Sequence, residues 1–102
     1  MGLDIRIIKI RHKHFNENDS IKDVYNNINS KFVAEFRNIW NLIDIFNPTE
    51  EEDENGNFYR FITKSIIDNL NSLDDNNESM RLKEISKTFD LDKFIYIVEF
   101  DY

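Results

Sequence analysis

Apolar residues near the start of the chain alternate with polar ones, as expected for a β-strand. They occupy every second position from Leu3 to Ile7 and then move to the other face at Ile8 and Ile10. A one-residue slip in a period of two predicts a β-bulge or a twist near Ile7 and Ile8. The segment 3–15 is therefore predicted to be extended.

The end of the chain carries a second extended segment, 93–101. Its residues from Phe94 to Val98 are all apolar, so both faces of the segment are apolar. Such a pattern predicts a strand that is covered on both faces and lies inside a sheet.

The segment 20–46 has apolar residues at helical spacing. They are Ile21, Val24, Tyr25, Ile28, Phe32, Phe36, Ile39, Trp40, Ile43 and Phe46. Ser20 can cap the start of this helix, and Pro48 disfavours helix at the residue before it. A single helix would be about 40 Å long, too long for a domain of this size, and 26–30 has poor helix propensity. The pattern predicts two helices, or one helix bent at 26–30, with Trp40 and the phenylalanines in the core.

Two further helices are predicted in the second half, after a short extended piece at 58–62. Thr63 caps the first of them. The apolar stripes of the two helices are Ile66, Ile67, Leu70 and Leu73, and then Met80, Leu82, Ile85 and Phe89. The segment 74–77 is predicted to be a turn between them.

These elements predict one α+β domain over residues 1–102. Its small sheet includes the N- and C-terminal strands and is packed by three or four helices. A chain of 102 residues has about the length of one domain.

The chain is acidic, with 20 Asp and Glu against 13 Lys and Arg and a formal net charge of −7. Such a charge repels phosphate backbones and anionic membranes and attracts basic proteins. It predicts a protein partner with a basic surface and no direct binding of nucleic acid or membrane. The longest apolar run, Phe94–Val98, is too short to span a membrane, and no signal peptide is visible, which predicts a cytoplasmic protein. A charge that serves only solubility stays open as an alternative.

Little in the sequence supports catalysis or cofactor binding. The chain has no cysteine, which excludes disulfides, thiolate nucleophiles and Cys-ligated metals. Its only glycines are Gly2 and Gly56, so no phosphate-binding loop of the Rossmann or P-loop type can be built. We expect no cofactor, no catalytic residue and no enzyme activity.

His12 and His14 are the first candidates for a metal site. At positions i and i+2 of a strand they would project to the same side. Their neighbours Arg11 and Lys13 are cations and oppose the binding of another cation. We interpret the two histidines as surface residues and predict no metal.

Candidate partner-binding residues centre on the carboxylate run 50–54. Its consecutive carboxylates lack the alternate spacing of a calcium loop. Phe58 and Tyr59 follow as adjacent residues of an extended segment, so one ring should point outward beside the carboxylates. The predicted partner-binding residues are Glu50, Glu51, Glu52, Asp53, Glu54, Phe58, Tyr59, Asp74 and Asp75. A solvated loop without a role stays open as an alternative.

Three stretches of the chain resemble a group of small proteins that are common in phages and bacterial mobile elements. They are Met1-Gly2-Leu3-Asp4-Ile5, the pairs Phe36-Arg37 and Ile45-Phe46 within 35–46, and Phe61-Ile62-Thr63-Lys64. The resemblance implies a phage-type origin and brings no known activity and no catalytic residues.

Charge and resemblance together lead to one functional hypothesis. The chain is expected to be a non-enzymatic acidic binding protein of the bacterial cytoplasm, a phage-type inhibitor that engages a basic, nucleic-acid-handling host protein, as an antagonist of host defence would. The alternative is a small ligand- or metal-binding domain or enzyme. Its pocket would lie between helices and sheet and use Arg37, His12, His14 and Tyr96.

Overall fold

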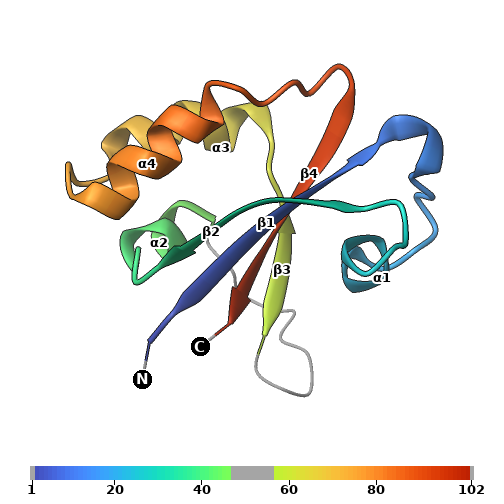
Figure 1. The fold of residues 1–102 in the computed structure, drawn as a ribbon, viewed down its shortest axis with the longest axis horizontal. Coiled ribbons are helices and arrows are strands. Elements are labelled where there is room, and N and C mark those ends of the chain that lie inside the picture. Colours follow the sequence, from blue (N-terminus) through green and yellow to red (C-terminus); the bar gives the residue numbers. More distant parts are fainter. Residues whose placement is uncertain (1, 47–56, 102) are drawn as a thin grey trace.

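The chain folds around a four-stranded antiparallel sheet with the strand order β2-β1-β4-β3 (Figure 1). The computed structural model describes residues 2–46 and 57–101. The strands are β1 (Asp4–Arg11), β2 (Lys31–Arg37), β3 (Phe58–Phe61) and β4 (Phe94–Asp101). The first and last strands pair with each other along their whole length, and β4 lies inside the sheet. The predicted pairing of the terminal strands in one sheet is therefore confirmed.

In the described ranges four short α-helices pack against this sheet and make the fold α+β, as predicted. They are α1 (Ile21–Tyr25), α2 (Asn41–Phe46), α3 (Lys64–Asn69) and α4 (Asn77–Ser86), and two 3₁₀ turns are η1 (His12–His14) and η2 (Leu70–Ser72). The side chain of Ser20 accepts a hydrogen bond from the backbone of Asp23, and that of Thr63 from Ile66. Both predicted N-caps are present.

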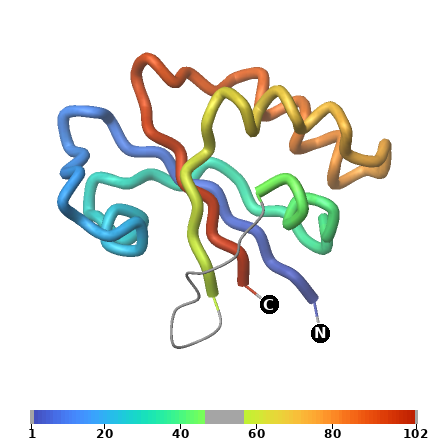
Figure 2. Tube along the Cα trace, turned by 180° about the vertical axis from the view of Figure 1, so that it is seen from behind, coloured from blue at the N-terminus to red at the C-terminus, as the bar shows by residue number. Residues whose placement is uncertain are grey.

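The helices cover the two faces of the sheet at opposite ends. Helices α2, α3 and α4 lie over one end of one face, and α1 lies at the other end, against the opposite face (Figure 2). Ile5 and Ile7 belong to the core under the first group, whereas Ile8 and Ile10 belong to the core under α1. Each face is therefore buried over one half and open over the other.

This arrangement explains the slip in the apolar pattern of β1. The register between β1 and β2 is irregular at Ile7 and Ile8, where Ile7 pairs with Ala34 and Ile8 with Phe32. The extra residue, Val33, is on β2, while β1 pairs with β4 without interruption. The predicted irregularity is confirmed, but the bulge is in the partner strand, and the apolar positions of β1 change face because the covering helices do.

The predicted helix over 31–37 is wrong, because this segment is strand β2. Its C-terminal half alternates buried Ala34 and Phe36 with exposed Glu35 and Arg37, a period of two. Pairing with β1, far away in the sequence, overrides the helical spacing of the aromatic residues. Phe32 is consequently 64% exposed.

Strand β2 is followed by Asn38, the only residue of the described chain other than glycine with a positive φ, 60°. The Asn38 Oδ1 atom accepts from the backbone N–H of Leu3 at 2.9 Å, and the Asn38 N–H donates to the Leu3 carbonyl at 2.8 Å. Asparagine tolerates this left-handed conformation better than most residues. Trp40 follows and is 49% exposed, so its predicted place in the core is also wrong.

None of the helices in the described ranges is both long and apolar enough to cross a lipid bilayer.

Candidate functional site

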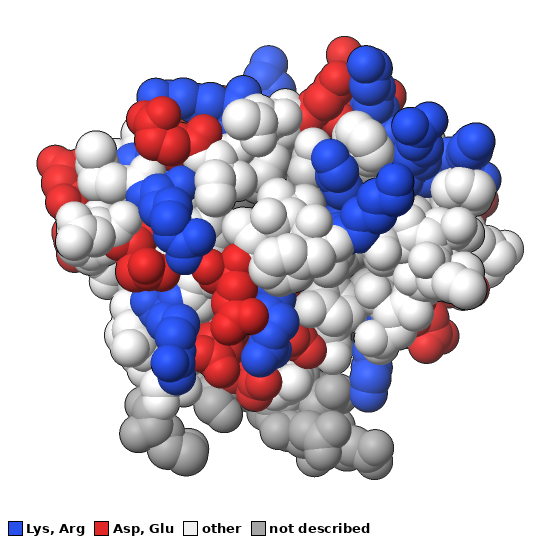
Figure 3. All heavy atoms as spheres, viewed as in Figure 1, with Lys and Arg blue, Asp and Glu red and all other residues white. Residues whose placement is uncertain are grey.

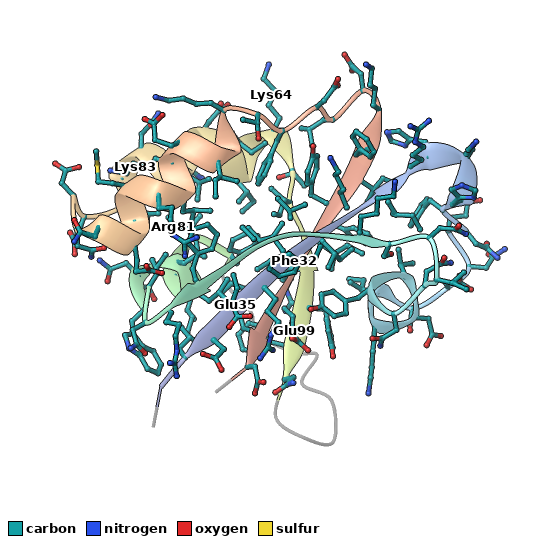
Figure 4. All side chains as sticks on the ribbon, viewed as in Figure 1. Phe32, Glu35, Lys64, Arg81, Lys83 and Glu99 are labelled. Carbon is teal, nitrogen blue, oxygen red and sulfur yellow. The ribbon has the colours of Figure 1, made fainter. Side chains whose placement is uncertain are left out.

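The open half of one sheet face carries a cluster of charged side chains at the end where the chain starts and finishes. We call it the acidic sheet face and define it as Asp4, Arg6, Glu35, Glu99 and Asp101. These residues come from β1, β2 and β4, and the register places Arg6 directly between Glu35 and Glu99. Figure 4 shows Glu35 and Glu99 on this face, below Phe32.

Arg6 is the centre of the cluster. Its Nη1 donates to Glu99 Oε1 at 2.7 Å and to Asp101 Oδ2 at 3.2 Å. Its Nε lies 3.5 Å from Glu35 Oε2, and its Nη2 lies 3.7 Å from Asp4 Oδ2. The hydrogen bond to Glu99 is the main reason why the pKa of Arg6 is raised above its usual value. The guanidinium therefore holds four carboxylates together and stays charged.

Glu99 is the one buried carboxylate of the cluster and is 7% exposed. Besides Arg6, its Oε1 accepts from the Tyr25 hydroxyl at 3.3 Å, and its Oε2 accepts from Tyr59 Oη at 3.0 Å and from Asn57 Nδ2 at 3.4 Å. Two donors per oxygen satisfy a carboxylate. Glu99 thus acts as an anchor that connects β4 to β1, α1 and β3.

The remaining carboxylates make the exposed part of this face negatively charged. Asp4, Glu35 and Asp101 keep 29%, 44% and 34% of their side-chain surface exposed. Arg37 adds a second cation, with its Nε 2.9 Å from Asp4 Oδ1. Four carboxylates against two guanidinium groups leave an excess of negative charge on an uncovered part of the sheet. Red and blue side chains lie next to each other there, at the lower centre of Figure 3.

The pKa of the Tyr25 hydroxyl depends on this cluster and can be measured. Burial first, and then the negative charge of Glu99, raises the pKa of Tyr25 from 10.0 to about 12. The unfolded chain ionises Tyr25 first as the pH rises, so its contribution to stability is present below pH 10 and is lost between pH 10 and about 12.

We expect the phenolate absorbance of Tyr25, obtained as the difference between the wild type and Tyr25→Phe, to titrate near pH 12. In Glu99→Gln the midpoint should fall toward the usual value, because the charge is removed and the burial stays. A titration midpoint of Tyr25 at pH 10 in the wild type would contradict the burial of Tyr25 and its hydrogen bond to Glu99.

Phe58 and Tyr59 do not form the exposed docking element that the sequence predicted. They do point to opposite faces, but both are buried, with 2% and 7% exposure, because Phe58 belongs to the core under α2 to α4 and Tyr59 belongs to the core under α1. The Phe58 ring stacks on the Phe100 ring, with 4.8 Å between the ring centres. The centres of the Tyr59 and Tyr25 rings are 5.1 Å apart. Only the Tyr59 hydroxyl reaches the acidic sheet face.

The other predicted partner-binding residues fall into two groups, one outside the described residues and one before α4. The run from Glu50 to Glu54 lies outside the described residues. Asp74 and Asp75 are exposed before α4, where Asp74 accepts from Asn41 Nδ2 at 2.9 Å and Asp75 lies 3.1 Å from Lys83 Nζ. Neither has a contact with the acidic sheet face.

A hollow of about 710 Å³ lies between β2 and α4. Its lining residues are Glu35, Arg37, Asn38, Asn76, Asn77, Glu78 and Arg81. Glu78 Oε2 accepts from the backbone N–H of Arg37 at 3.1 Å and from Arg81 Nη2 at 3.2 Å, which together lower the pKa of Glu78. Arg81 also donates to the Glu35 carbonyl, so α4 occupies hydrogen-bonding groups of the outer edge of β2.

The pocket expected in the alternative hypothesis does not form from its four predicted residues. Arg37 lines the hollow beside α4, but Tyr96 is buried, and its hydroxyl accepts from the backbone of Asp90. His12 and His14 are exposed at the other end of β1.

The two histidines also differ from their predicted geometry. Strand β1 ends at Arg11, so they lie in the 3₁₀ turn η1 and not on a strand. His12 Nε2 lies 3.0 Å from the Leu91 carbonyl oxygen. Within residues 2–46 and 57–101, no three histidine, aspartate or glutamate side chains are grouped so that they could hold a metal ion.

Arg6 and Glu99 were missed as site residues by sequence reasoning. They are 93 positions apart and meet only because the first and last strands pair. One signal was available, because Glu99 is the single charged residue within the apolar segment 94–100. A carboxylate in such a position requires a cationic partner.

Comparison of the chain with protein-family models, with curated proteins and with solved structures gives no match.

Proposed function

We propose that this chain is a non-enzymatic binding protein whose acidic sheet face docks on a basic surface of another protein. The observation that carries the proposal is the excess of carboxylates over guanidinium groups on this face, where Asp4, Glu35 and Asp101 are partly exposed and the buried Glu99 fixes the position of Arg6. A rigid strand surface with fixed charges favours complementary docking, because little side-chain freedom is lost on binding.

The amino-acid sequence supports the same partner class. The run Glu50–Glu54 ends three residues before Asn57, which contacts Glu99 at the edge of the acidic sheet face. The formal net charge of −7 acts in the same direction and increases the rate of encounter with basic partners.

The partner class in this proposal is a nucleic-acid-handling protein of a bacterial host. DNA- and RNA-binding surfaces are basic, so an acidic face can compete with nucleic acid for them. The resemblance to phage and mobile-element proteins supports the same setting, in which the chain acts as an inhibitor or defence antagonist in the bacterial cytoplasm.

The test is capture of partners from nuclease-treated bacterial lysate with the tagged chain, followed by mass spectrometry. We expect the double variant Glu35→Lys/Asp101→Lys to lose basic partners at least tenfold, and the loss to be largest at about 50 mM salt, where screening is weak. If the double variant unfolds, the capture of basic partners is measured with Glu35→Lys alone.

A matched control is Asp68→Lys/Glu84→Lys, which also changes the net charge from −7 to −3 and alters two exposed helix residues away from the face. If the control loses the same proteins, net charge alone explains binding. If no basic protein is captured by the wild type, the proposal is wrong. A third variant, Glu51→Lys/Asp53→Lys, measures how much the carboxylate run contributes to the capture of basic partners.

A further inference from the structure

The open half of the other sheet face is basic. We call it the basic end and define it as Lys9, Arg11, Lys13, Lys31 and Lys93. Blue side chains gather over this end of β1 and β4 at the upper right of Figure 3. Within the described ranges, none of the five forms an ion pair with a carboxylate, whereas Arg6, Arg37, Arg81, Lys83 and Lys87 all do.

The strand register brings like charges together at this end. Lys9 of β1 lies directly opposite Lys31 of β2, and such a pair is destabilising in a sheet. Lys9 Nζ lies 4.3 Å from the centre of the Phe94 ring, and the guanidinium carbon of Arg11 lies 6.0 Å from the same ring. The ring partly offsets the repulsion. A bound anion would neutralise these charges, which the described residues leave without a counterion.

Two hollows meet at the basic end. The first, of about 280 Å³, is lined by Lys9, Arg11, Lys13, His14, Ile28, Asn29, Lys31 and Phe94. The second, of about 370 Å³, is lined by Arg11, His12, Lys13, Asp92, Lys93 and Phe94. Arg11, Lys13 and Phe94 belong to both, so the cations follow a continuous surface longer than a single phosphate. Asp92 is the one carboxylate among the lining residues.

The apolar groups at the same place restrict the class of ligand. Ile28 is 97% exposed at the rim of the first hollow, and the Phe94 ring lies between the two hollows. A surface that combines cations with an aromatic ring and an exposed aliphatic side chain suits a strand whose phosphates contact the cations while its bases contact the apolar groups. A duplex keeps its bases stacked inside and would leave the exposed Ile28 side chain without an apolar contact.

We propose that the basic end binds single-stranded nucleic acid. The net charge of −7 predicted no such binding, but a net charge averages over the whole molecule and does not show where the cations lie. The two charged surfaces lie on opposite faces and toward opposite ends of β1: at ~3.3 Å per residue, Asp4 and Arg11 are about 23 Å apart, and the nearest members, Arg6 and Lys9, are about 10 Å apart. At 0.1 M salt the Debye length is about 10 Å, so Asp4 and Asp101 are largely screened from Arg11, Lys13 and Lys93, and Glu35 and Glu99 are partly screened from Lys9.

This inference goes beyond the proposed function and uses none of its residues. The acidic sheet face and the basic end can therefore fail or succeed independently. The capture experiment above is performed after nuclease treatment, and the experiment below contains no second protein, so the two results are distinguishable.

The test is fluorescence anisotropy of labelled oligo-dT and oligo-U, about twelve nucleotides long, titrated with the full chain. Three to four phosphate contacts predict a slope of about −2 to −3 in a plot of log K against log salt. Lys13→Glu/Lys31→Glu should weaken binding at least tenfold and reduce that slope by about 1.4. Both residues are exposed, and the thermal unfolding midpoint checks that the variant folds.

Lys64→Glu/Lys87→Glu is the matched control, because it also changes the net charge from −7 to −11 and alters exposed residues of α3 and the end of α4. It should bind within about threefold of the wild type, since distant charges are screened. Equal loss in both double variants, or no salt-dependent binding by the wild type, overturns the proposal.

Competition identifies the class of ligand. Unlabelled oligonucleotide should displace the probe, and inorganic phosphate at the same phosphate concentration should not. If phosphate alone is as effective, the site takes a single anion and the strand proposal is wrong. If polyglutamate or vesicles with anionic lipid compete as well as the oligonucleotide, the basic end belongs to an acidic protein or a membrane surface, which also overturns it.

Discussion

Replacing Phe36 by alanine is expected to lower the free energy of unfolding by about 4 kcal/mol. Phe36 of β2 is fully buried in the core under helices α2 to α4, and the guanidinium carbon of Arg81 lies 4.3 Å from the centre of its ring. The substitution removes a large apolar side chain from a packed core and leaves a cavity. Urea denaturation followed by circular dichroism measures the change.

Phe32→Ala is the matched control, because it makes the same chemical change four residues earlier. Phe32 is 64% exposed, so its loss should cost less than about 1 kcal/mol. In a helix, positions 32 and 36 would share one face and both substitutions would be costly. Similar losses for the two variants would therefore contradict strand β2 and restore the helix that the spacing predicts.

Glu99→Ala is expected to lower the free energy of unfolding by about 3 kcal/mol. The variant leaves the Arg6 guanidinium without its closest carboxylate and the Tyr25 and Tyr59 hydroxyls without their acceptor. Arg6 keeps 30% of its side chain exposed and retains Asp101, so the loss lies at the lower end of the range for buried pairs. Denaturation at neutral pH measures it.

Glu35→Ala separates burial from charge in the same cluster. Glu35 also faces Arg6, at 3.5 Å, but is 44% exposed, and exposed ion pairs contribute less than about 1 kcal/mol. Glu99→Gln should lie between the two, since the amide keeps one acceptor and the shape. Equal effects of Glu35→Ala and Glu99→Ala would show that Glu99 is not the anchor described above.

The two charged surfaces have a common structural cause. Helices α2 to α4 and helix α1 cover opposite faces at opposite ends, so two half-faces stay open. Strand β1 supplies charged residues to both, with Arg6 in the acidic sheet face and Lys9 and Arg11 in the basic end. A single strand thus links the proposed protein-docking surface to the proposed strand-binding surface.

Several elements could be predicted from local pattern alone. The strands at both ends, the caps at Ser20 and Thr63 and the irregularity at Ile7 and Ile8 were all visible in the order of apolar, polar and capping residues. The α+β class follows from these elements. Each of these features is marked by residues that are near each other in the sequence, although the strands themselves pair with distant segments.

Strand β2 and both charged surfaces were decided by tertiary structure. Ile28, Phe32 and Phe36 are at helical spacing, yet pairing with β1 makes residues 31–37 a strand. Ile28 and Phe32 are consequently exposed. Net charge could not show that cations and carboxylates separate to opposite ends, because that separation depends on which half-face each helix covers.

The sequence by itself thus determined the terminal strands, the helix starts and the fold class, since local propensity and period act over a few residues. The partners of Arg6, the burial of Phe58 and Tyr59 and the opposed charged surfaces were decided only by the tertiary structure. They depend on contacts such as that of Arg6 with Glu99, which are 93 positions apart and which no local pattern encodes.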